Sequence, residues 1–228
     1  MNTLQYLLFD LDGTLTDPGP GITNCVAYAL EKFNVYPATR EELYPYIGPP
    51  LTWSFQEYHG LSEPQAEQAL LYYRERFSVK GLFENELYAG IQELLADMQS
   101  RGVTLIVATS KPEEFTHRIL EHFDLAKYFS FVGGNTLDEK RPTKSAVIEH
   151  IRTQYPDICA ENTCMIGDRR FDVEGAHAFG LPAIGVLYGY GDRAEMEAAG
   201  ADYIVEDVTT LHRFLLAKRT QKEMEQKD

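Results

Sequence analysis

From residue 88 onward, short apolar runs alternate with amphipathic segments, and this alternation constrains the fold more than any other feature. The run VTLIVAT, 103–109, is rich in β-branched residues and is followed by PEEFTHRILEHF, which opens with proline and two acids, as helices do. The same strand-then-helix pattern recurs in four further pairs: YFSFVGG with a helix from Thr143, TCMIGD with a helix from about Phe171, PAIGVLYG with RAEMEAAG, and DYIVE with TLHRFLLAK. Strands that are apolar throughout are buried on both faces, which is typical of a parallel sheet with helices on both sides. The sequence therefore predicts an α/β fold with a Rossmann-like, three-layer core.

Between the first apolar strand and residue 88 the sequence predicts no strand. Helical segments are expected at residues 21–34, about 39–46, 51–59 and 63–78. Ser62 and Gln65 have the spacing of a capping box at the start of the last of these helices. The stretch DPGPG, 17–21, is the expected hinge into this insert, and residues 79–88 are the expected hinge back. We expect a core domain made of residues 1–17 and 88–228, and a small helical cap domain made of residues 18–87.

The balance of charges bears on the partners that this chain can have. Its formal net charge is -14, from 35 acidic and 21 basic residues among 228, which argues against a nucleic acid polymer or an anionic membrane as partner. No apolar stretch approaches the roughly 20 residues that cross a bilayer, and no secretion signal is visible. The three cysteines form no even disulfide framework. We expect a cytoplasmic protein that acts on a small molecule; its oligomeric state does not follow from these features.

Polar residues gather where the predicted strands end, and in parallel sheets ligands bind beyond the carboxyl ends of the strands. These residues are Asp10 with Asp12, Thr109 with Ser110, Lys144 at a helix start, and Asp168 in MIGDRRFD. The strand-end carboxylates of Asp10 and Asp168 would repel at close range unless a cation lies between them, and their oxygen atoms suit Mg²⁺. Mg²⁺ commonly shares its ligand shell with phosphate, and one carboxylate can then attack phosphorus. Thr109 and Lys144 supply the hydroxyl and the ammonium that hold the other phosphate oxygens.

Four segments in this order, DLDGTLTD, VATSKP, RPTKSAVI and MIGDRRFD, resemble the four motifs of the haloacid dehalogenase superfamily of phosphatases. The resemblance covers the whole chain. It implies that Asp10 is the nucleophile and a Mg²⁺ ligand, and that Asp12 is the general acid and base, with its backbone carbonyl on the metal. The remaining implied roles are phosphate binding by Thr109, charge neutralisation by Lys144, metal binding by Asp168, and support of that metal site by Asp172. Dehalogenases of the superfamily lack the second acid, so Asp12 argues against a dehalogenase.

The insert resembles the helical cap that closes over the site in this superfamily. Within it, YIGPPL, 46–51, resembles the specificity loop of phosphoglycolate phosphatase-like members, which implies that Gly48 and Pro49 contact the substrate together with Ser110. Bacterial members of this branch include phosphoglycolate phosphatases and 5'-nucleotidases. We therefore expect a Mg²⁺-dependent phosphomonoester hydrolase that forms an aspartyl phosphate and acts on a small phosphorylated metabolite, phosphoglycolate or a nucleoside 5'-monophosphate.

Three alternatives stay open at this point. A sugar phosphomutase would retain the same motifs and return the phosphoryl group to a bound intermediate. A phospho-receiver module also uses acids, Mg²⁺, a hydroxyl and a lysine, although its phosphate-accepting acid follows a middle strand. A protein that binds phosphate without turnover is the third. The roles of Lys111 and Arg169, either phosphate contact or pairing with nearby acids, are also undecided from the sequence.

Overall fold

The computed structural model describes residues 4–225, with the side chains of the last helix described to residue 218. The chain divides into two compact units. One comprises Met1–Leu15 and Leu87–Asp228 and is called the core unit below. The other, Thr16–Glu86, is called the inserted unit. Each is described by itself.

The core unit is built on a parallel sheet, as the sequence predicted. Its six strands are β1 (Tyr6–Phe9), β4 (Thr104–Pro112), β5 (Phe129–Asn135), β6 (Thr163–Gly167), β7 (Ala183–Val186) and β8 (Tyr203–Val205). Their order across the sheet is β5-β4-β1-β6-β7-β8, and every neighbouring pair is parallel. β1 is therefore central, with β4 and β6 on its two sides.

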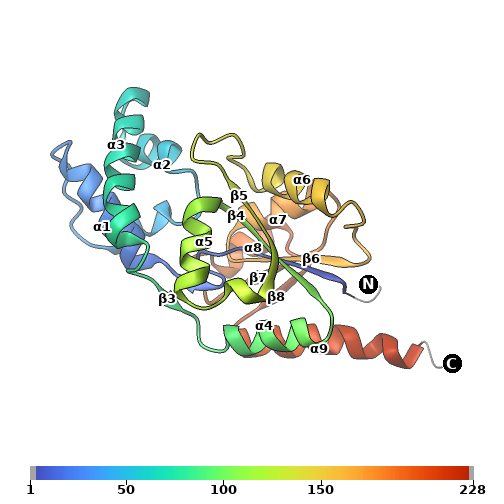
Figure 1. Cartoon of the computed structure of the whole chain (residues 1–228). Coiled ribbons are helices and arrows are strands. Elements are labelled where there is room, and N and C mark those ends of the chain that lie inside the picture. The colour runs from blue at the N-terminus through green and yellow to red at the C-terminus, as the bar shows by residue number, and fades with distance from the viewer. Residues whose placement is uncertain (1–3, 226–228) are drawn as a thin grey trace. The chain divides into compact units, whose positions relative to one another are not determined.

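Helices cover both faces of this sheet, which confirms the predicted α/β architecture. They are α4 (Ile91–Ser100), α5 (Glu113–His122), α6 (Lys144–Gln154), α7 (Arg170–His177), α8 (Arg193–Ala199) and α9 (Val208–Glu225), with a short 3-10 helix, η3 (Ala126–Tyr128). α7 packs between α6 and α8 in one layer, whereas α4 and α9 lie side by side (Figure 1).

Burial on both faces explains why the strands are apolar throughout. Leu8 and Ile106 from the sheet pack with Val147 of α6 and Val173 of α7. The neighbours of Leu8 in β1, Leu7 and Phe9, are also fully buried although their side chains alternate to the opposite face. A strand that is buried on both faces therefore shows no alternation of apolar and polar residues.

The inserted unit is mainly helical and has its own buried residues. Its helices are α1 (Gly19–Glu31), the 3-10 helix η1 (Glu41–Tyr46), α2 (Leu51–His59), α3 (Glu63–Arg76) and a π-helical turn, η2 (Phe77–Gly81). α3 packs against both α1 and α2. The capping box predicted at the start of α3 is confirmed, because the backbone N–H of Ser62 donates to Gln65 Oε1 at 2.9 Å.

Three local features differ from the sequence prediction. Two-residue strands, β2 (Thr16–Asp17) and β3 (Glu86–Leu87), pair with each other in a region where no strand was predicted. The first helix begins at Gly19, inside the expected hinge 17–21, because proline is tolerated in a first helical turn. The segment expected at 39–46 is a 3-10 helix from Glu41, and it contains Pro45, which cannot take part in an α-helical hydrogen-bond ladder.

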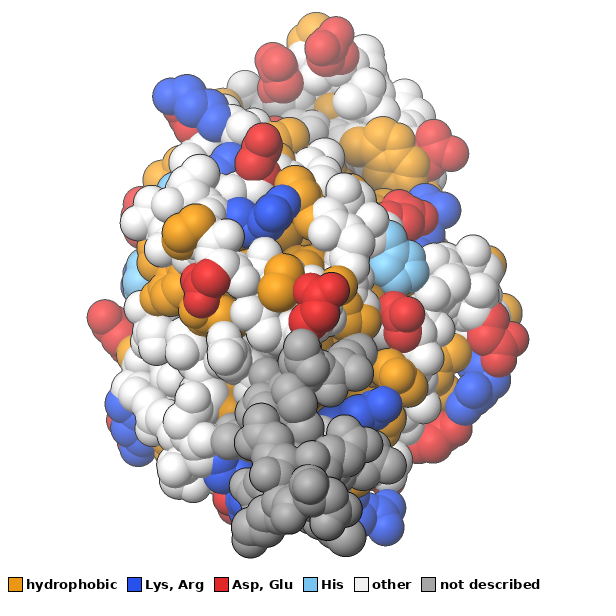
Figure 2. Space-filling model, turned by 90° about the vertical axis from the view of Figure 1, so that its right-hand side faces the viewer, with side chains coloured by type: hydrophobic (Ala, Val, Ile, Leu, Met, Phe, Trp, Pro, Cys, Tyr) orange, Lys and Arg blue, Asp and Glu red, His pale blue; other side chains and the backbone are white. Residues whose placement is uncertain are grey.

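The surface carries charges of both signs. In Figure 2, red and blue side chains of the described residues are interspersed with neutral and apolar ones, without a continuous basic area on the face in view. Among residues 4–225, no helix has both the length and the apolar character needed to cross a membrane.

Candidate active site

The three central strands bring most of the predicted site residues to one edge of the sheet. Asp10 directly follows β1, Thr109 lies in the last part of β4, and Asp168 directly follows β6. The register aligns these ends, because Phe9 of β1 is paired with Val107 of β4 and with Ile166 of β6. Parallel strands present their carboxyl ends together, so the motifs converge although they lie far apart in the sequence.

Three buried carboxylates form a cluster at this edge. One oxygen from each of Asp10, Asp168 and Asp172 lies within 4.8 Å of the others. Asp172 also helps to start α7, because its Oδ2 accepts a hydrogen bond from the Arg169 backbone N–H at 3.1 Å. Three carboxylates at this spacing repel one another unless cations or protons compensate their charges.

Lys144 compensates part of that charge from the first residue of α6. Its Nζ lies 2.9 Å from Asp10 Oδ1 and 2.7 Å from Asp172 Oδ1, and it donates to the backbone carbonyl of Ala108 at 2.7 Å. Thr143 is the N-cap of α6, because its Oγ1 accepts from the Ala146 N–H at 3.2 Å, and this contact fixes the helix start. Burial alone lowers the pKa of Lys144, but the charges of Asp10 and Asp172 outweigh it and raise that pKa. Lys144 is therefore a fixed positive charge.

Asp168 is held in a closely fitted polar environment. Its Oδ2 accepts from the Tyr190 backbone N–H at 2.8 Å, and its Oδ1 lies 3.4 Å from Thr14 Oγ1. Gly13 adopts φ +78°, and a Cβ there would lie only 2.0 Å from Asp168 Oδ2. The turn after β1 must therefore contain glycine at this position.

Burial shifts the proton affinities of the clustered acids. Complete burial, with smaller contributions from the charges of Asp172 and Asp10, raises the pKa of Asp168 well above its usual range. Burial also raises the pKa of Asp172 to about 6, even though the charge of Lys144 opposes the shift. Carboxylates that are costly to ionise in this way gain stability from a cation.

Asp12, the second acid of the first motif, is paired with Lys111 at the end of β4. Lys111 Nζ donates to Asp12 Oδ2, and both side chains are largely buried. Burial raises the pKa of the Asp12 carboxyl, with the charge of Lys111 opposing that shift. A carboxyl group that holds its proton more tightly than usual is suited to act as a general acid.

The hydroxyl groups of the second motif lie next to this pair. Thr109 is buried, and its Oγ1 accepts from the Lys111 backbone N–H at 3.3 Å. Ser110, between them, is half-buried. Gly48 and Pro49 belong to the inserted unit, in the turn between η1 and α2, and Gly48 adopts φ +109°. Their contact with substrate stays a prediction.

Comparison with known proteins shows the family of this chain. The sequence profile described as "Haloacid dehalogenase-like hydrolase" matches residues 7–186. The chain belongs to the haloacid dehalogenase-like hydrolase family. The family resemblance and the prediction of an enzyme of the hydrolase class are thereby confirmed.

Relatives in this family carry several names. A "5'-nucleotidase" of Pseudomonas aeruginosa is 42% identical over 93% of this chain and 96% of its own length. A "Tyrosine-protein kinase PtkA" of Mycobacterium tuberculosis is 38% identical over 91% of this chain and 67% of its own length. A "Phosphoglycolate phosphatase" of Escherichia coli O157:H7 is 29% identical over 91% of both chains.

The fold is also seen in a crystal structure of another protein. A predicted phosphatase from Clostridium acetobutylicum has a TM-score of 0.92 and 46% sequence identity. The match covers 95% of this chain and all of that one.

The residues present fit the Mg²⁺ ion that this haloacid dehalogenase-like family implies. Four acids, Asp10, Asp12, Asp168 and Asp172, face only two lysines, Lys111 and Lys144, in these contacts. With all of them ionised, the group carries two more negative than positive charges, which one divalent cation balances. Carboxylate oxygens are also the ligands that Mg²⁺ prefers.

The sequence left the roles of Lys111 and Arg169 undecided, and it did not single out Tyr190. Lys111 contacts Asp12, whereas Arg169 Nε lies 2.9 Å from Glu195 Oε1, outside the acid cluster. The backbone N–H of Tyr190 holds Asp168, and its position in the glycine-rich segment GYGD was the available signal. A lysine directly after the Thr-Ser pair was the signal for Lys111.

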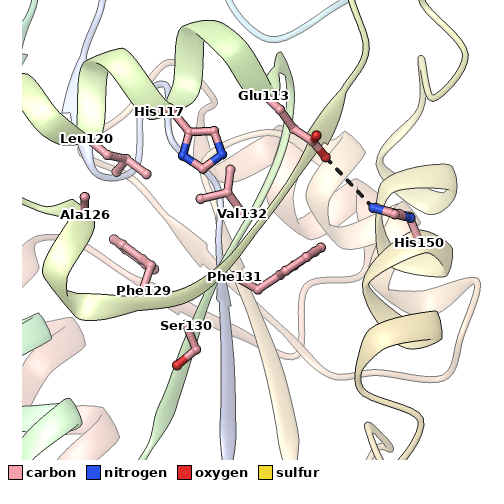
Figure 3. Close-up of a pocket in the computed structure, with 9 residues that line it drawn as sticks. All are labelled: Glu113, His117, Leu120, Ala126, Phe129, Ser130, Phe131, Val132 and His150. Atoms are coloured by element: carbon pink, nitrogen blue, oxygen red, sulfur yellow. Dashed lines mark ion pairs between the residues drawn. The ribbon is translucent and has the colours of Figure 1, made fainter.

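A separate pocket lies at the edge strand β5. It has a volume of about 390 Å³ and is lined by side chains of α5, β5 and α6, among them Glu113, His117, Phe131 and His150 (Figure 3). Glu113 Oε1 lies 4.0 Å from His150 Nε2 and 2.8 Å from Arg141. None of the predicted site residues lines this pocket.

Proposed function

We propose that this chain is a Mg²⁺-dependent phosphomonoester hydrolase that works through an aspartyl phosphate on a small phosphorylated metabolite. The observation that carries the proposal is the convergence of four acids and two lysines at the ends of β1, β4 and β6. Buried acids of raised pKa beside fixed positive charges are characteristic of a reacting site.

In the first step Asp10 is the nucleophile. Its Oδ1 lies 2.9 Å from Lys144 Nζ and accepts from the Leu11 N–H at 2.7 Å, and neither contact uses Oδ2. We therefore expect Oδ2 to attack phosphorus. The bond from Asp10 to phosphorus forms as the bond to the ester oxygen breaks, and that oxygen takes a proton from Asp12.

In the second step the aspartyl phosphate is hydrolysed. A water molecule gives a proton to Asp12 and attacks phosphorus, the bond to Asp10 breaks, and inorganic phosphate leaves. Thr109 and Lys144 hold the phosphoryl oxygens through both steps. Asp10, Asp168 and the backbone carbonyl of Asp12 would hold Mg²⁺, with Asp172 supporting the metal site, and the bound ion would supply neutralisation of the phosphoryl charge.

The preferred substrate in this proposal is a nucleoside 5'-monophosphate, followed by phosphoglycolate. The relative named for nucleotides is 42% identical, against 29% for the one named for phosphoglycolate. Residues 18–87 act as the cap domain, in which Gly48 and Pro49, together with Ser110 of the core, contact the substrate. The net charge of -14 favours dissolved metabolites in the cytoplasm over nucleic acid polymers.

The test is release of inorganic phosphate with Mg²⁺ or with EDTA, across nucleoside 5'-monophosphates, phosphoglycolate, sugar phosphates and pyrophosphate. The proposal predicts Mg²⁺-dependent release from one class, with nucleotides fastest. Absence of release from every monoester in the presence of Mg²⁺ would contradict it.

A second candidate is phosphoryl transfer to a tyrosine hydroxyl, because a relative 38% identical is named a tyrosine-protein kinase. The same chemistry would then end on an acceptor other than water, as it would in a phosphomutase. Adding ATP and a tyrosine-containing peptide to the panel separates these outcomes, since a kinase leaves phosphate on the peptide and a hydrolase releases it into solution.

A further inference from the structure

Lys111 makes a buried contact that the family motifs do not require. Its Nζ donates to Asp12 Oδ2 from the other strand of the β1–β4 pair, across 99 positions of sequence. The Lys111 backbone is fixed as well, because its N–H donates to Thr109 Oγ1. The Lys111 backbone is thus fixed, and its ammonium group contacts one oxygen of the Asp12 carboxylate.

The two oxygens of Asp12 differ in their surroundings. Oδ2 is held by Lys111, whereas Oδ1 is buried and has no hydrogen-bond partner among the described residues. A buried carboxylate oxygen without a partner is costly, and in a reacting site it indicates an atom that is satisfied by the ligand. The ligand atoms available to Asp12 are the ester oxygen and, after it leaves, the attacking water.

The exposed lysine–aspartate pairs of this chain are different in kind. The side chains of Lys111 and Asp12 are 6% and 13% exposed, whereas those of Lys127 and Asp124 are 51% and 74% exposed. Solvated pairs such as the latter contribute little to stability and cost little to form. A buried pair loses the hydration of both charges, so stability alone is a poor reason for its presence.

We infer that Lys111 is a positioning residue that holds Asp12 by Oδ2 so that Oδ1 meets the reacting oxygen. The inference rests on the proposed function, because it presupposes that Asp12 exchanges protons with substrate and water. In the first step the proton on Oδ1 moves to the ester oxygen as that oxygen leaves phosphorus. In the second step Oδ1 takes a proton from the attacking water.

The test compares two substrates that differ in their need for that proton. Phenyl phosphate releases a basic phenolate that needs protonation, whereas p-nitrophenyl phosphate releases an anion that needs little. Release of the phenol is measured in a single turnover, with enzyme in excess and Mg²⁺ present, so that only the first step is observed. The variant is Lys111→Met, which keeps the aliphatic stem and removes the ammonium.

We expect Lys111→Met to slow phenol release at saturation at least about tenfold, part of the 10²–10⁴ that general acid catalysis contributes. Release of p-nitrophenol falls less than about threefold, and the substrate concentration at half-maximal rate changes little. Equal slowing of both substrates would overturn the inference, because it would make Lys111 a phosphate ligand or a structural residue. No slowing of either would overturn it too.

Two further proteins complete the design. Lys127→Met, from the exposed pair, is the matched control and is expected to keep both rates. If Lys111→Met does not fold, Lys111→Gln, which keeps a donor and loses the charge, gives the same comparison. A wild-type protein that releases phosphate from neither aryl phosphate and from no other monoester tested would contradict the proposed function, whereas active wild type without substrate discrimination in the variants would contradict only the role of Lys111.

Discussion

At the scale of single residues, Asp10 carries the central claim. Asp10→Asn keeps the shape of the side chain and removes the nucleophile, so we expect phosphate release to fall by at least about a thousandfold. Steady-state phosphate release from the best substrate measures the loss. Asp124→Asn, at an exposed carboxylate, is the control and is expected to retain full activity. An Asp10→Asn variant within a factor of ten of wild type would contradict the proposed mechanism.

Gly13 tests the fit around Asp168. Both Gly13 and Gly102 have φ above +70°, but a Cβ on Gly13 would lie 2.0 Å from Asp168 Oδ2, whereas one on Gly102 would meet nothing within 4 Å. Gly102→Ala is expected to cost about 1–2 kcal/mol of backbone strain and keep activity. Gly13→Ala is expected to cost more and to abolish activity, which urea unfolding and phosphate release measure. Similar losses of activity in both variants would contradict this account.

Buried acids make metal binding dependent on pH. Burial raises the pKa of Asp172 from 3.8 to about 6, and it raises that of Asp168 well above its usual range. A raised pKa in the folded state means that these groups favour folding below pH 4, and that this contribution is lost as pH rises through about 6. Mg²⁺ binds the ionised acids, so the increase that it causes in the melting temperature of the protein should be small at pH 5 and larger at pH 7.5. A gain independent of pH would contradict the cluster as the metal site.

Recognisable motifs predicted Asp10, Thr109 and Lys144 as site residues. The structure places Lys144 in contact with Asp10 and Thr109 in the last part of the neighbouring strand β4, and their catalytic roles stay predictions. The sequence did not identify the partner of Asp12, because a contact between residues 12 and 111 depends on the pairing of two strands rather than on local pattern. The pairing of Arg169 with Glu195 depends on the packing of α7 against α8, which local pattern does not reveal either.

At the scale of elements, the start of α6 determines where Lys144 lies. Thr143→Ala removes the cap that accepts from the Ala146 N–H, and we expect it to lower the free energy of unfolding by about 1 kcal/mol. Thr143→Ser keeps the acceptor and is expected to lose much less. Urea unfolding of the two variants measures the difference, and equal losses would contradict the capping role.

The long elements followed from the sequence because their patterns span many residues. The strand VTLIVAT, the helix that starts with the Ser62–Gln65 capping box and the helix that follows Thr143 were predicted and are observed. β2 and β3 have two residues each, which is too short for any periodicity, so their pairing could not be predicted. The strand β4 extends to Pro112, past the expected end at 109, with an irregular register after Ala108. That extension contains Lys111.

At the scale of the whole molecule, the order of strands explains how distant motifs form one site. β1 lies between β4 and β6, so the ends of the first, second and last motifs meet at one edge, and α6 adds Lys144. The alternating pattern predicted a parallel sheet but not this order. Strand order is set by packing of the crossover helices between elements that are distant in sequence.

The most direct test of the central claim is mass spectrometry of the protein after rapid acid quenching during turnover with Mg²⁺ and its best substrate. The account predicts added mass of one phosphoryl group on the peptide that contains Asp10, and its absence in Asp10→Asn. The aspartyl phosphate should accumulate further in Asp12→Asn if this substitution slows its hydrolysis more than its formation. A phosphoryl group found on another residue would contradict the account. So would rapid turnover of wild type through a phosphorylated species that still forms in Asp10→Asn.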